Sequence, residues 1–111
     1  MLEENKVYKW NGGAFVYLGL EKDENETPFV KFLQYIQMSG KTDCMNIIEV
    51  PQDYVLEDSG NINFKDNYGD FLKGSAHGHG ENADRFVGKD FVKLKRIYDN
   101  ALEKSLKEVK I

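Results

Sequence analysis

The two histidines of this sequence, His77 and His79, lie two residues apart in the stretch GSAHGHGEN, and the acids Glu81 and Asp84 follow closely. Imidazole and carboxylate groups are zinc and transition-metal ligands, and the same groups serve general acid-base catalysis. Glycines interrupt the histidine pair and favour a loop over a strand. Ordering such a loop costs about 1 to 2 kcal/mol per residue. The sequence therefore predicts a surface loop with solvated imidazoles, and no metal ligand, cofactor or catalytic residue.

A second group of candidate functional residues consists of four aromatic residues, two before and two after Asn11-Gly12-Gly13. Tryptophan and tyrosine combine a large rigid surface with a polar group, and they are frequent anchors of protein interfaces. The flanking segments KVYKW and AFVYLGL are rich in strand-forming residues. An Asn-Gly or Gly-Gly pair between two such segments predicts a β-hairpin.

The parity of this hairpin decides which side chains share a face. A loop of Asn11-Gly12 pairs Trp10 with Gly13, and a loop of Gly12-Gly13 pairs Trp10 with Phe15. Both registers place the same aromatic set on one face: Tyr8, Trp10, Phe15 and Tyr17. Both place an aliphatic set on the other: Val7, Ala14, Val16, Leu18 and Leu20. The aliphatic face suits a sheet core, so we expect the C-terminal helix, a ligand or a partner to cover the aromatic face. The four aromatics are the predicted binding residues.

Residues 28–38, PFVKFLQYIQM, fit two structures. Thr27, Pro28 and the later Gly40 suit the N-cap, first turn and C-terminus of a helix. The interior is rich in β-branched and aromatic residues, which favour a buried strand, and strand is the prediction. The stretch CMNIIEV predicts another strand that ends at Pro51, and DYVLED predicts a short extended segment.

Together these segments predict an α+β fold. Four or five strands within residues 5–58 indicate a small curled antiparallel sheet or an SH3-like barrel, and a glycine-rich loop region over residues 59–82 follows. Residues 90–109 predict an amphipathic C-terminal helix. Its apolar side contains Phe91, Leu94, Tyr98, Leu102 and Val109, and its basic side contains Lys89, Lys93, Arg96 and Lys107. With 111 residues and no repeat or linker, residues 1–111 are expected to form a single domain.

Composition disfavours several classes of protein. The single cysteine, Cys44, cannot form an intrachain disulfide and fits a reducing compartment. The polar, acidic start lacks a secretion signal, and no apolar run approaches the ~20 residues that span a bilayer, so we expect a cytoplasmic protein without membrane contact. The net charge is −4, and residues 1–60 contain 11 acidic and 5 basic residues. This sign disfavours nucleic acid as a partner.

The sequence thus favours a small non-enzymatic protein-binding module that acts through a protein partner. Its 13 lysines against 2 arginines, with nine asparagines, are typical of AT-rich genomes and suggest a bacterial, phage or mobile-element protein that binds a host factor. One alternative is a metal-dependent or acid-base enzyme that uses His77 and His79. The other is a nucleic-acid-binding small barrel that stacks bases on the aromatic residues.

Overall fold

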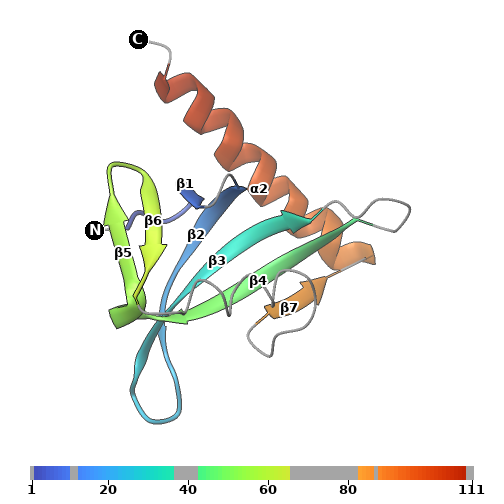
Figure 1. Cartoon of the computed structure of the whole chain (residues 1–111). Helices are drawn as coiled ribbons and strands as arrows, with labels where there is room; N and C mark the ends of the chain where they lie inside the picture. Colours follow the sequence, from blue (N-terminus) through green and yellow to red (C-terminus); the bar gives the residue numbers. More distant parts are fainter. Residues whose placement is uncertain (1, 11–12, 37–42, 66–82, 87, 110–111) are drawn as a thin grey trace.

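A computed structural model describes residues 2–10, 13–36, 43–65, 83–86 and 88–109. They form an α+β fold, an antiparallel sheet followed by a C-terminal helix, as the sequence predicts (Figure 1). In chain order the elements are β1 (Val7–Trp10), β2 (Gly13–Lys22), β3 (Pro28–Ile36), β4 (Cys44–Pro51), the 3-10 turn η1 (Gln52–Tyr54), β5 (Val55–Asp58), β6 (Asn61–Phe64), β7 (Ala83–Phe86) and α2 (Gly88–Val109).

The strands of the described residues form one open sheet in the order β5-β6-β1-β2-β3-β4-β7. Neighbours are antiparallel except β1 and β6, which pair in parallel at a single position, Lys9 with Asn61. A barrel requires the two edge strands to pair, and β5 and β7 lie at opposite edges, so the SH3-like barrel is not confirmed. The prediction of four or five strands missed β6 and β7, which are only four residues long and border the glycine-rich region.

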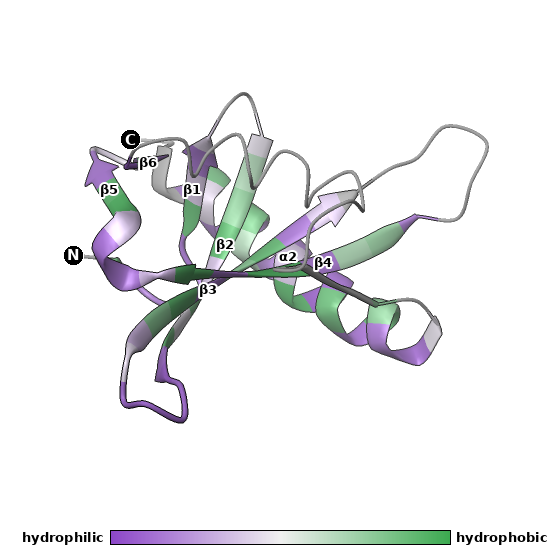
Figure 2. Cartoon of the chain, turned by 60° about the horizontal axis from the view of Figure 1, so that its bottom comes forward, coloured by the Kyte–Doolittle hydropathy of each residue, from purple (hydrophilic) through white to green (hydrophobic). Residues whose placement is uncertain are grey.

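Residues 28–36 form a strand, as predicted, because both of its faces are buried. Val30 and Phe32 belong to the core on one side of the sheet, and Leu33 belongs to the core on the other. Thr27, which resembled a helix N-cap in the sequence, belongs to a turn instead. Asp23 Oδ1 accepts hydrogen bonds from the backbone N–H groups of Thr27 and Asn25 at 3.0 and 2.8 Å. Such an Asx-type turn stabilises the hydrophilic hairpin loop between β2 and β3 (purple in Figure 2).

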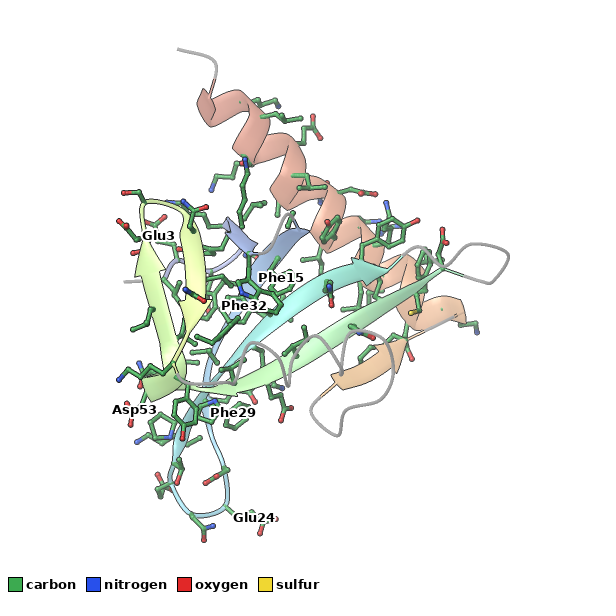
Figure 3. All side chains as sticks on the ribbon, in the orientation of Figure 1. Glu3, Phe15, Glu24, Phe29, Phe32 and Asp53 are labelled. Atoms are coloured by element: carbon green, nitrogen blue, oxygen red, sulfur yellow. The ribbon has the colours of Figure 1, made fainter. Side chains whose placement is uncertain are left out.

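The two faces of the sheet carry two separate cores. The aromatic core consists of Tyr8, Phe15, Tyr17, Val30, Phe32, Ile48, Val50, Ile62 and Phe64, and Figure 3 shows Phe15 and Phe32 near its centre. The helix core consists of Val16, Leu33, Met45, Tyr98 and Ala101, with half-buried neighbours that include Phe91, Leu94, Ile97 and Leu102. Three strands separate β6 from β4 in the sheet, yet both contribute to the aromatic core, so the sheet curls and folds its β5–β6 edge over one face.

The C-terminal helix confirms the predicted amphipathic pattern, beginning two residues earlier than expected. On its apolar side, Phe91, Leu94, Tyr98 and Leu102 pack with residues of β2, β3 and β4, and the side chain of Val109 lies outside the described ones. The basic residues Lys89, Lys93, Arg96 and Lys107 are exposed. Two i,i+4 ion pairs lie on α2: Lys95 with Asp99 at 2.7 Å and Lys107 with Glu103 at 3.6 Å. Within the described part of the chain, no helix combines the length and apolarity needed to span a membrane.

A β-bulge in β2 corrects one expectation about the hairpin faces. The pairing of β2 with β3 shifts between Tyr17 and Gly19, so Tyr17 opposes Phe32 and Leu20 opposes Val30. An extra residue reverses the side-chain alternation beyond it. Leu20 therefore lies on the aromatic face of the sheet, 49% exposed, and not on the helix face with Val16.

Candidate functional site

The aromatic hairpin forms in one of the two predicted registers. Trp10 pairs with Gly13 and Tyr8 pairs with Phe15, as a two-residue loop at positions 11–12 requires. Tyr8, Phe15 and Tyr17 pack in the aromatic core, and Trp10 packs against that core as a half-buried neighbour. The prediction that the four side chains share a face is therefore confirmed.

Strand β6 covers this face, and not the helix, ligand or partner that the sequence led us to expect. The helix packs on the opposite face of the sheet, and Tyr8, Phe15 and Tyr17 are no more than 6% exposed. Ile62 and Phe64 of β6, which the sequence analysis placed in a loop region, cover them together with β3 and β4. The prediction of an open aromatic patch is therefore wrong for three of the four predicted binding residues, which lie in the core.

Trp10 differs from the other three because it lies at the margin of the aromatic core. Its ring contacts Phe64 edge-on, with centroids 5.1 Å apart, and Phe15 at 5.7 Å. These contacts fix the orientation of the indole, and its half-buried position leaves part of it open. A rigid, partly open tryptophan is the kind of side chain that anchors a partner.

A groove of roughly 920 Å³ lies beside this tryptophan, between the β1–β2 hairpin and the β5–β6 hairpin. The two hairpins pair at one position, Lys9 with Asn61, and the groove lies beside this pair. Its described lining is Lys9, Trp10, Gly13, Ala14, Leu56, Glu57, Asp58, Asn61, Ile62 and Asn63. The structure therefore brings Trp10 together with residues about 50 positions later in the chain.

Strand register divides this lining into two rows on opposite faces of the sheet. Residues that pair across neighbouring strands lie on the same face of the sheet. Asp58 pairs with Asn61, Asn61 with Lys9, and Lys9 with Ala14, so these four residues form the first row. Leu56 lies in line with this row, opposite Asn63 and 47% exposed. The second row begins with Glu57 opposite Ile62.

The second row runs from Glu57 and Ile62 to Trp10 and Gly13. Because the two rows lie on opposite faces of the sheet and line the same groove, the groove extends around the edge of the sheet. Ala14 of the first row also contacts the helix, because the Tyr98 hydroxyl donates a long hydrogen bond of 3.4 Å to its carbonyl oxygen. The groove is thus polar along one row and aromatic at the end of the other.

The groove carries two acidic groups and one basic group. Glu57 Oε1 accepts a hydrogen bond from the Gly60 N–H at 3.3 Å, and Asp58 Oδ1 accepts one from the Ser59 hydroxyl at 3.2 Å. Among the described residues, neither carboxylate forms an ion pair, and Lys9 forms none either. These charges are therefore available to groups of a partner.

A buried asparagine beside a half-buried glutamine, on the aromatic face of the sheet, is a further feature that the sequence did not reveal. Gln34 on β3 opposes Asn46 on β4, and Asn46 is fully buried. Within the described residues, Gln34 Oε1 and both side-chain polar atoms of Asn46 make no hydrogen bond. Buried polar groups of this kind destabilise a fold unless something satisfies them.

The predicted histidine loop falls outside the described residues, because His77, His79 and Glu81 belong to 66–82. Asp84 lies in β7. Among the described residues, no three His, Cys, Asp or Glu side chains are close enough to hold a metal ion. Cys44 is buried in β4.

The β5–β6 half of the groove was absent from the sequence-based site, although the chain carries a signal for it. Asp58-Ser59-Gly60 is a turn sequence, and Asn-Ile-Asn-Phe after it alternates polar and apolar residues, as a half-buried strand does. Comparison of the chain with protein-family models, curated proteins and solved structures finds no match.

Proposed function

We propose that this chain is a non-enzymatic protein-binding module that holds a segment of its partner in the groove beside Trp10. The observation that carries the proposal is the half-buried indole at the groove wall, held edge-on against Phe64. Its ring is oriented before binding, so little conformational entropy is lost on contact. Leu56, 47% exposed on the same groove, adds a second apolar contact.

The polar lining supports a peptide as the ligand. Asn61 and Asn63 are exposed. The Asn61 amide offers a donor and an acceptor that match the C=O and N–H groups of a peptide backbone. Asn63 offers its amide N–H groups, since its Oδ1 accepts a hydrogen bond from the Phe64 N–H at 2.9 Å. Apolar anchors beside a few placed polar groups are typical of binding sites. The groove therefore suits a protein segment that inserts an apolar side chain against Trp10.

The experiment is an affinity selection of random peptides on the immobilised protein, followed by titration of the enriched peptides with Trp10 fluorescence as the signal. Trp10 is the only tryptophan, so any change in emission reports on the groove. We expect enriched peptides to bind at micromolar affinity and to shift the emission. A selection that enriches nothing above an empty support would contradict the proposal.

A matched pair of variants localises the binding. Leu56→Ser alters the groove, whereas Leu20→Ser alters a leucine of similar exposure, 49% against 47%, that is not part of the groove lining. Leu56→Ser should weaken binding about fivefold or more, since one buried leucine contributes about 1.5 to 3 kcal/mol when fully covered. Equal loss in both variants would show that the peptides bind elsewhere.

A further inference from the structure

We infer that the partner segment is basic, with a lysine or arginine next to the apolar residue that contacts Trp10. This inference rests on the proposed function and adds the chemistry of the partner to it. The groove holds two carboxylates, Glu57 and Asp58, against one ammonium group, Lys9. Among the described residues, no cation neutralises either carboxylate.

The two carboxylates flank the groove from both faces of β5. Glu57 lies in the row that ends at Trp10, and Asp58 lies in the row that contains Lys9, because successive residues of a strand point to opposite faces. A cation of the partner that approaches the outer end of the groove therefore meets a carboxylate on either side of the rim. Lys9 is two strand spacings from Asp58, about 9 to 10 Å away, so it leaves this end acidic.

The turn that follows β5 holds these carboxylates in place. Ser59 and Gly60 have positive φ values of 51° and 88°, and their hydroxyl and N–H groups donate to Asp58 and Glu57. Each carboxylate keeps a second oxygen for the partner, since these hydrogen bonds use one oxygen of each group. The tight turn thus presents two acidic groups at the mouth of a groove that has a tryptophan along one wall.

The test uses three acetylated and amidated heptapeptides of alternating serine and leucine, in which the first and last residues are both lysine, both serine or both glutamate. Trp10 fluorescence and the chemical shifts of backbone amides report binding to the full chain. We expect the lysine peptide to bind at least about tenfold more tightly than the glutamate peptide at low salt, and this preference to shrink as salt screens the charges.

Two double variants with the same change in net charge assign the preference to the groove. Glu57→Gln with Asp58→Asn keeps the acceptor oxygens for the Ser59 and Gly60 donors and removes both charges. The control, Glu24→Gln with Glu26→Gln, changes the exposed hairpin loop far from the groove (Figure 3 labels Glu24). The groove variant should lose about three- to tenfold in affinity for the lysine peptide, and the control should lose less than twofold.

The outcomes separate this inference from the proposed function. If the serine or glutamate peptide binds at Trp10 as tightly as the lysine peptide, the groove binds peptides but the basic partner is wrong. If both double variants lose affinity equally, the preference arises from overall charge and the inference is also wrong. If no peptide shifts Trp10 or the neighbouring amides, the proposed function fails together with the inference.

Discussion

Among single side chains, Trp10 and Asn46 depart most from an ordinary core. Trp10 packs on the aromatic core but remains half-buried at the groove, whereas Asn46 is polar and fully buried. A buried amide without partners costs free energy, and a partly open tryptophan leaves apolar surface in water. The exposed part of Trp10 forms part of the groove wall.

Replacement of Asn46 by leucine should raise the free energy of unfolding by about 1 to 3 kcal/mol. Leucine has a branched shape similar to that of asparagine, and it removes two polar atoms that no described residue satisfies. Urea unfolding followed by circular dichroism measures the effect. A loss of stability in Asn46→Leu would show that the amide has a partner that stabilises the fold.

Tyrosine burial predicts a loss of stability at high pH. Burial raises the pKa of Tyr17, with the nearby Glu4 carboxylate acting in the same direction, and burial also raises the pKa of Tyr98. The unfolded chain releases these protons near pH 10, whereas the folded chain retains them to higher pH. Stability should therefore be complete below about pH 10 and fall as the pH rises through the folded-state pKa values.

Urea unfolding at several pH values between 8 and 11 checks this direction. The variant Tyr17→Phe removes one of the two groups and should show a shallower decline than the wild type. Stability that stays constant to pH 11, or a decline of equal slope in the variant, would contradict the role assigned to tyrosine burial.

Among the elements, β2 has the most demanding geometry because it bends at Gly19. This residue has φ +137°, and a Cβ placed on it would lie 2.7 Å from Glu4 Oε1. The bend coincides with the bulge between Tyr17 and Gly19, beyond which Leu20 lies opposite Val30 on the aromatic face. The local course of β2 after Tyr17 thus depends on a glycine.

Gly19→Ala should destabilise the protein by about 1 to 3 kcal/mol, because alanine rarely adopts this backbone conformation. Gly13→Ala is the matched control on the same strand: its added Cβ would come no closer than 3.5 Å to the Trp10 carbonyl oxygen, and its φ is not positive. The control should change stability by less than about 0.5 kcal/mol. Equal thermal stability of both variants would show that the bulge tolerates a side chain.

Sequence patterns predicted the elements with strong local signals and missed those that depend on distant contacts. The hairpin and its shared aromatic face followed from the Asn-Gly-Gly turn, although two registers stayed open until the structure selected one, and the helix followed from its apolar period. The strands β6 and β7 are four residues each. The alternation of β6 after the Asp58-Ser59-Gly60 turn is a strand signal, but over four residues it is too short to separate a strand from a loop. The fold of β6 over Phe15 is a tertiary contact between residues far apart in the chain, and no local pattern encodes it.

Within the candidate site, too, the sequence predicted the residue with a local signal and missed the residues that tertiary pairing brings to it. Trp10 was predicted because its type and its place in the hairpin are local properties. Its partners in the groove, Leu56, Asn61 and Asn63, depend on the parallel pairing of β1 with β6 at one residue pair. The burial of Tyr8, Phe15 and Tyr17 follows from the same curl of the sheet.

In the whole molecule, two cores on opposite faces of one curled sheet explain how a chain of 111 residues can leave a groove open. The helix covers one face, and the sheet's own β5–β6 edge covers the other. The groove lies where that edge diverges from the β1–β2 hairpin, so its walls belong to two hairpins that pack on the same core.

Mapping of amide chemical shifts tests most directly whether this groove binds a protein segment. The lysine-ended heptapeptide is added to the ¹⁵N-labelled chain, and each backbone amide is followed. We expect saturable shifts confined to residues 9, 10, 13, 14, 56–58 and 61–63, which line the groove. Shifts confined to the exposed basic side of α2, or no shifts at millimolar peptide, would contradict binding in the groove.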